Sequence, residues 1–126
     1  MRRVGATEWL RTPTHNGDME RAVAISRDTV GSAGIYAAVV TTAPGAATRR
    51  HHHGDCETAI YVLSGQASFS SGPTGVENTL DAAAGDFVYI PAGEVHVEQN
   101  ASTTEELVVI VARNCSDAVT IYVDEE

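Results

Sequence analysis

Three of the chain's five histidines are consecutive, at His51, His52 and His53. Alternate side chains of a strand share a face and lie about 6.6–6.8 Å apart along its axis. His51 and His53 therefore share a face, and His52 points away. Two imidazoles at this spacing can bind one metal ion, and a turn at Gly54-Asp55 can bring the carboxylate of Glu57 toward the same ion.

A second segment of the chain supplies a further imidazole. The sequence Pro91-Ala92-Gly93-Glu94 predicts a turn that ends one strand and presents His96 on the next. This third imidazole completes a site of three histidines and one carboxylate, Glu57. Such a site fits one divalent transition-metal ion with open coordination positions, because imidazole suits Zn, Cu, Fe and Ni.

Glu98 lies two residues after His96, so strand alternation predicts that it shares the inward face. A carboxylate inside a protein is costly unless it is paired or does chemistry. Two interpretations stay open: Glu98 is a catalytic proton acceptor, or it meets water at the mouth of the fold. Glu57 is the other candidate for the catalytic role.

The rest of the chain has the pattern of short strands. Apolar alternation is common, helical periodicity is scarce, and runs of β-branched and aromatic residues are separated by Gly, Pro, Asn and Asp. The expected strands lie at 22–25, 34–41, 58–63, 67–70, 87–90, 107–112 and 119–123. Such spacing predicts an all-β antiparallel sandwich or barrel. We interpret Ala82-Ala83-Ala84 as a connector leading into Gly85.

A length of 126 residues predicts a single domain. Residues 1–20 have a weaker pattern and are expected to form an N-terminal arm or an edge strand, and residues 21–126 are expected to form the barrel. His15 is expected to be a loop residue, and Asp124-Glu125-Glu126 a solvent-exposed tail.

Charge and composition exclude several classes of partner. The net charge is −9 and all eight basic residues are arginines, so the basic stripe that binds nucleic acid or anionic membranes is missing. No apolar run approaches the roughly 20 residues of a membrane helix, and no apolar stretch follows Arg2-Arg3 as in a signal peptide. We therefore expect a cytoplasmic protein in which Cys56 and Cys115, although they could pair, are free thiols.

These spacings resemble the two signature motifs of the cupin superfamily. The first family motif, G-x5-H-x-H-x3,4-E-x6-G, is matched within residues 45–65 by Gly45, His51, His53, Glu57 and Gly65. The second motif, G-x5-P-x-G-x2-H-x3-N, is matched within residues 85–100 by Gly85, Pro91, Gly93, His96 and Asn100.

The chain departs from the family pattern at one point. Seven residues lie between Glu57 and Gly65, where the family has six, so the family's carboxylate position falls on Thr58. Either a β-bulge brings Glu57 into that position, or three histidines hold the metal and Glu57 lies beside them.

The resemblance implies a cupin-type jelly-roll β-barrel in a small single-domain bacterial protein, and small cupins are commonly homodimers. It implies one metal ion held by His51, His53 and His96, with or without Glu57, and a small-molecule substrate. The expected function is that of a mononuclear metalloenzyme, either of dioxygenase type with Fe, Mn, Ni or Cu, or a Zn-dependent isomerase or cyclase like the cupins that cyclise polyketides. The alternative is a non-catalytic sensor or binding module.

Overall fold

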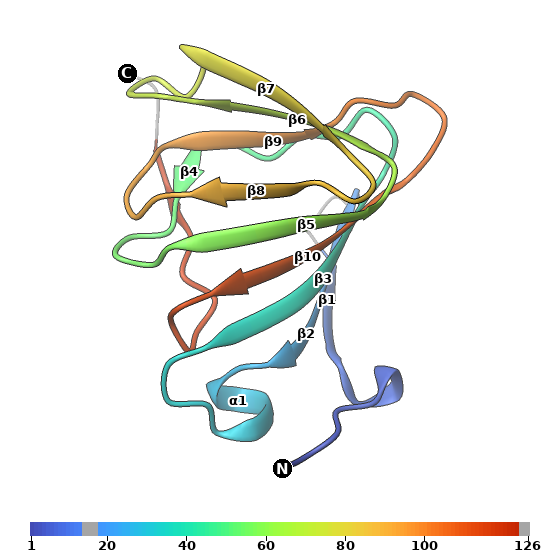
Figure 1. Ribbon diagram of the computed structural model, residues 1–126, viewed down its shortest axis with the longest axis vertical. Coiled ribbons are helices and arrows are strands. Elements are labelled where there is room, and N and C mark those ends of the chain that lie inside the picture. Colours follow the sequence, from blue (N-terminus) through green and yellow to red (C-terminus); the bar gives the residue numbers. More distant parts are fainter. Residues whose placement is uncertain (14–17, 124–126) are drawn as a thin grey trace.

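The computed structural model describes residues 1–13 and 18–123. Two antiparallel sheets pack against each other, and the helices of the described residues are a 3-10 turn at Ala6–Glu8 and the short α1 at Arg27–Val30 (Figure 1). None of these helices is long and apolar enough to cross a membrane. The expected all-β jelly-roll class is confirmed. His15 and the tail Asp124-Glu125-Glu126 lie outside the described residues.

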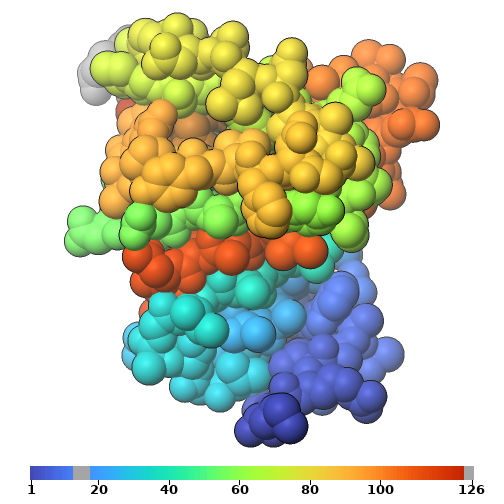
Figure 2. All heavy atoms as spheres, in the orientation of Figure 1, coloured from blue at the N-terminus to red at the C-terminus, as the bar shows by residue number. Residues whose placement is uncertain are grey.

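The larger sheet has six strands. Their spatial order is β1 (Leu10–Pro13), β2 (Met19–Ile25), β3 (Tyr36–Thr42), β10 (Leu107–Arg113), β5 (Thr58–Ser64) and β8 (Phe87–Ile90). The segment expected to be an arm or an edge strand thus contributes β1, at the edge of this sheet. Figure 2 shows the N-terminal residues, in blue, packed beside the light-blue and cyan part of the chain that contains β2 and β3.

The smaller sheet has five strands. Their order is β11 (Ile121–Tyr122), β4 (His51–His52), β9 (His96–Asn100), β6 (Gln66–Ser71) and β7 (Asn78–Ala83). The expectation of a connector at residues 82–84 is wrong, because Ala82 and Ala83 belong to β7. Only Ala82 of this edge strand is buried, so the strand lacks the apolar alternation that would reveal it.

The interior is apolar along most of its length. One buried cluster joins both sheets, with Ile60, Val62, Val109 and Val111 from the larger sheet and Phe69 from the smaller one. Burying such side chains contributes about 1.5–3 kcal/mol each, which makes this cluster the main source of stability. The sheets therefore form a packed core that holds the two ends of the barrel in place.

Asn100 closes one end of the barrel, which we call the asparagine end. Its buried Nδ2 donates to the carbonyls of Thr42 and Glu105, at 3.1 and 2.8 Å, and its Oδ1 accepts from the Ser102 amide at 2.9 Å. Nearby, Gly65 turns the chain from β5 into β6 with φ of 93°, and a Cβ there would lie 2.6 Å from the Glu106 carbonyl oxygen. Both motif residues thus have structural reasons to be present.

A disulfide joins Cys56 and Cys115, whose Cα atoms are 5.8 Å apart, so the expectation of two free thiols is wrong. The cause is strand register. Arg113 pairs with Thr58 across β10 and β5, and the same antiparallel register continued two residues further places Cys115 opposite Cys56. A disulfide is more typical of oxidising compartments than of the cytoplasm, and the cytoplasmic location stays a prediction.

Candidate metal centre

Three histidines meet at the end of the barrel opposite Asn100, which we call the histidine end. His51 on β4 pairs directly with His96 on β9, and His53 follows β4 within the next turn. All three are buried, and one nitrogen of each lies within 4.8 Å of the corresponding nitrogens of the other two. The structure therefore brings together the three imidazoles that the sequence predicted as ligands.

Backbone carbonyls fix the orientation of all three rings. Nδ1 of His51, His53 and His96 lies 2.7, 2.7 and 2.8 Å from the carbonyl oxygens of Arg49, Val119 and Glu94. A carbonyl can only accept, so each Nδ1 donates a proton, and Nε2 of the neutral ring has a free lone pair. This is the arrangement in which metal-binding histidines are held.

The donor set fits one divalent transition-metal ion. Imidazole nitrogen suits Zn, Cu, Fe and Ni, and three such donors leave positions open for other ligands. Nε2 of His96 is buried and has no hydrogen-bond partner among the described residues, although buried polar atoms are normally paired. An ion at the centre of the three imidazoles would satisfy it.

The protonation states of His51 and His53 also favour a ligand role. Burial, followed by His96, lowers the pKa of His51, and burial, followed by the Arg113 guanidinium, lowers the pKa of His53 to about 3. Burial opposes the charged form of His96 too, but the Glu98 carboxylate outweighs it and raises the pKa of this histidine. His51 and His53 are thus neutral imidazoles at neutral pH, as ligation requires.

Glu98 lies beside the cluster, on the inward face expected for it. Its Oε1 is 3.6 Å from Nε2 of His96, and its side chain is 18% exposed. Burial raises the pKa of this carboxyl group, but His96 has the larger net effect, so the pKa is lowered and Glu98 is a carboxylate. It therefore combines features of both interpretations, since it contacts the cluster and also reaches solvent.

Glu57 lies apart from the three converging imidazoles. Its side chain is exposed, and its carboxylate accepts hydrogen bonds from the Tyr89 hydroxyl at 2.7 Å and from Nδ2 of Asn114 at 3.0 Å. Thr58, the next residue, begins β5 with its side chain inward, so alternation turns Glu57 outward. Thr58 thus occupies the family's carboxylate position.

His52 is separate from the cluster, as its position between the two ligand candidates predicts. Its Nδ1 accepts a hydrogen bond from the Gly54 amide at 3.0 Å, and it is absent from the set of converging nitrogens. It provides an internal control for the assignment of the other two.

Sequence reasoning missed one residue of the site, Arg113. It is 8% exposed, and its Nη2 lies 3.4 Å from Nε2 of His53. A signal was present: Leu107, Val109 and Val111 alternate along the strand, and the same period of two places Arg113 inward.

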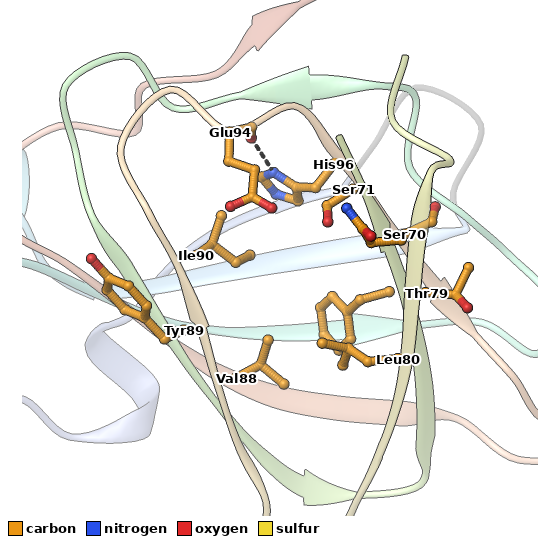
Figure 3. A pocket seen from close by; sticks show the side chains of 11 residues that line it. Ser70, Ser71, Thr79, Leu80, Val88, Tyr89, Ile90, Glu94 and His96 are labelled. Carbon is orange, nitrogen blue, oxygen red and sulfur yellow. Dashed lines mark hydrogen bonds between the residues drawn. The ribbon is translucent and has the colours of Figure 1, made fainter. Parts of the chain in front are cut away.

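A small cavity reaches His96 from the side of β7 and β8 (Figure 3). Its volume is about 70 Å³, and its lining includes Leu80, Val88 and Ile90. Figure 3 also shows the hydrogen bond between His96 and the Glu94 carbonyl at the upper end of this cavity. Typical ligand pockets measure about 300–1,000 Å³, so this apolar cavity accommodates only a small chemical group.

Comparison with known proteins agrees with this geometry. The family model described as "Cupin domain" matches residues 38–113. No curated protein sequence matches the chain. Among solved structures, the oxalate decarboxylase of Bacillus subtilis, a protein with Mn(II) centres, is 26% identical with a TM-score of 0.77, and the match covers 88% of this chain and 29% of that one.

Two further structures share the fold. The formate complex of the Lactobacillus farciminis oxalate decarboxylase has a TM-score of 0.80 at 21% identity, covering 93% of this chain and 34% of that one. An oxalate oxidase has a TM-score of 0.75 at 19% identity, covering 87% and 57%. The chain spans about a third of the length of the two decarboxylases.

Proposed function

The chain belongs to the cupin family, and from that premise we propose that it is a mononuclear metalloenzyme acting on a small organic molecule. In this proposal His51, His53 and His96 hold one divalent transition-metal ion, and Glu98 is the catalytic carboxylate. Glu57, on the outer surface, has no part in it.

One observation carries the proposal: three imidazoles are oriented by backbone carbonyls so that three Nε2 atoms face one point, with a carboxylate beside them. A buried ring nitrogen is normally paired within the protein, and Nε2 of His96 has no such partner among the described residues. When bound, the metal ion would supply Lewis acidity and a template for substrate oxygen atoms.

Glu98 is placed to move protons. As a carboxylate 3.6 Å from Nε2 of His96, it acts as a proton acceptor rather than as a donor at the start of the reaction. Its partial exposure gives the accepted proton a route to solvent. The apolar cavity beside His96 excludes water from the neighbouring part of the substrate.

Two reaction types follow from this constellation, a redox reaction of dioxygenase type and a non-redox isomerisation or cyclisation with Zn. Elemental analysis of gently purified protein, followed by oxygen uptake with a panel of catechols and flavonols, separates them. Oxalate belongs in the panel because two solved relatives act on it, as their names state. Fe-, Mn-, Ni-, Cu- and Zn-loaded samples are compared.

Oxygen uptake with a redox metal supports the dioxygenase type, and Zn-dependent turnover without oxygen uptake supports the isomerase or cyclase. A metal-loaded protein that converts no substrate would support the alternative, a non-catalytic binding module. A wild-type protein that takes up no metal after reconstitution would overturn the proposal altogether.

We also propose that the protein is a homodimer. The outer face of the six-stranded sheet carries large apolar side chains, with Phe87 75% and Tyr89 63% exposed. Exposed apolar side chains gathered on one face are typical of interaction surfaces. Light scattering during size-exclusion chromatography tests this, and a monomer at micromolar concentration would overturn it.

A further inference from the structure

The histidine end contains a second group of polar residues, on the sheet facing the histidines. Tyr36, Arg113 and Thr58 are direct neighbours on β3, β10 and β5, with Arg113 paired to both others. All three side chains are buried, with exposures of 2, 8 and 1%. They form one row across the sheet.

The adjacent row on the same three strands is entirely apolar. It consists of Ala38, Val111 and Ile60, which pair in the same way. The sheet thus changes from a dry core to buried polar groups within two residues of strand. The change is abrupt and confined to the end that faces the three imidazoles.

The polar row is poorly satisfied within the chain. Nε and Nη1 of Arg113, Oγ1 of Thr58 and the Tyr36 hydroxyl are buried without hydrogen-bond partners among the described residues. All of these groups can donate a hydrogen bond. Nη2 of Arg113 contacts His53 and its guanidinium carbon lies 5.2 Å from the centroid of the Tyr36 ring, but burying a cation whose other donors are unused still costs free energy. The row therefore needs a hydrogen-bond acceptor, and an anionic acceptor would also balance the charge of Arg113.

Charge at the histidine end leads to the same requirement. Nη2 of Arg113 is 3.4 Å from Nε2 of His53, so the guanidinium lies next to the proposed metal position. A divalent ion and Arg113 would together bring three positive charges, whereas Glu98 supplies one negative charge and the three imidazoles none. An anion is needed to balance the rest.

We propose that Arg113, Thr58 and Tyr36 form a binding subsite for a carboxylate group, so that the substrate is a small carboxylic acid. The inference rests on the proposed function, because it places the subsite beside the metal. The planar guanidinium offers several donors in a fork that matches a carboxylate, and the two hydroxyls add neutral donors. Thr58, at the family's carboxylate position, is uncharged, so the anion would come from the substrate.

Acetate and acetamide are suitable probes because they have nearly the same shape and differ in charge. Their dissociation constants are obtained from the shift of the thermal unfolding midpoint with ligand concentration, at constant ionic strength. Measurements are made on the metal-free and on the Zn-loaded protein, and elemental analysis records the metal content of each sample. We expect acetate to stabilise the wild type and acetamide to have no comparable effect.

Arg113→Met retains the length of the side chain and removes its charge. We expect this variant to lose about 10–100-fold in acetate affinity, the usual effect of deleting a charge-assisted hydrogen-bond partner. Arg113→Lys keeps the charge but lacks the planar guanidinium, so its acetate affinity should lie between those of Arg113→Met and the wild type. Arg11→Met, at an exposed arginine paired with Glu20, is the matched control and should bind acetate like the wild type.

Stability without added carboxylate separates a binding role from a structural one. Removing a buried, incompletely paired cation should leave the unfolding midpoint of Arg113→Met equal to or above that of the wild type. Wild-type acetate affinity in Arg113→Met would overturn the subsite. So would acetamide binding equal to acetate binding.

The two proposals fail in different ways. Metal retained with acetate affinity independent of Arg113 overturns the subsite and leaves the metalloenzyme intact. No metal uptake, with acetate affinity of the metal-free protein still lost in Arg113→Met, overturns the metalloenzyme and leaves an anion-binding site.

Discussion

The two ends of the barrel treat buried polar groups in opposite ways. At the asparagine end, every hydrogen-bonding group of the Asn100 side chain is paired with backbone. At the histidine end, His96, Arg113, Thr58 and Tyr36 all keep buried atoms without a partner among the described residues. The buried Asn100 side chain is thus fully hydrogen-bonded at one end, whereas several buried polar groups at the other end are not.

This difference separates stability from function. Satisfied buried groups rigidify a fold, whereas unsatisfied ones weaken it unless a ligand completes them. The asparagine end holds the loops around β10, and the apolar core between the ends contributes most of the free energy of folding. Substitution of Asn100 should therefore affect stability, and substitution of the unpaired polar groups at the histidine end should affect ligand binding.

The largest effect is expected from His96→Ala. Losing one of three metal-binding imidazoles should weaken metal affinity by more than the roughly 10–100-fold caused by losing a residue that merely supports a ligand. The strand signal in circular dichroism should persist, because the core is apolar. Elemental analysis after dialysis measures the ion, and His52→Ala, which should keep its metal, is the matched control. Metal loss in both variants alike would mean that the register at residues 51–53 is wrong.

The second-largest effect is expected from Glu98→Gln. The substitution is nearly isosteric but removes the proton acceptor, so turnover should fall by about 10²–10⁴-fold while the metal content stays unchanged. Steady-state kinetics with the substrate that the panel identifies, on samples of measured metal content, provide the test. Unchanged turnover would make Glu98 a residue that only contacts water at the barrel mouth.

The disulfide lies at the histidine end and tests whether that end needs covalent support. It closes a sequence separation of 59 residues, so replacing Cys56 and Cys115 together by Ala should lower the free energy of unfolding by about 2–4 kcal/mol. Urea denaturation of this variant, and of the wild type with and without reductant, measures the loss. Equal stability in all samples would show that the bond adds nothing to the native fold.

Asn100→Ala examines the opposite end. It removes the hydrogen bonds to the carbonyls of Thr42 and Glu105 and from the Ser102 amide, and we expect a loss of about 1–3 kcal/mol in the free energy of unfolding. The metal content should equal that of the wild type. If metal were lost without a change in stability, the separation of roles between the two ends would be false.

Local spacing predicted the parts of the site that local geometry decides. His51, His53 and His96 follow from strand alternation and from the turn at residues 91–94, and the main strands follow from apolar alternation. The sequence did not predict β7, because a mostly exposed edge strand lacks the buried face that produces apolar alternation. The Cys56–Cys115 pair required the register of β5 against β10, which no local signal specifies.

Arg113 and Glu57 show the limits of motif reasoning in opposite directions. Arg113 lies outside both motifs, and only its continuation of the β10 alternation points to it. Glu57 matches the glutamate of the first motif, but a difference of one residue in spacing moves a side chain to the opposite face of a strand. In the structure Thr58 takes the inward position and Glu57 the outward one.

The smallest effect is accordingly expected from Glu57→Gln. On the outer face, the carboxylate only accepts from Tyr89 and Asn114, and an exposed hydrogen bond of this kind contributes little to stability. Metal affinity and turnover should therefore stay within about twofold of the wild type, well below the roughly 10–100-fold effect of losing a residue that supports a ligand. Metal titration of Glu57→Gln, His96→Ala and His52→Ala under the same conditions compares the metal affinities of the three variants. A loss of metal in Glu57→Gln near that of His96→Ala would mean that the start of β5 shifts by one residue when the ion binds, which brings the motif glutamate inward and displaces Thr58 from the carboxylate subsite.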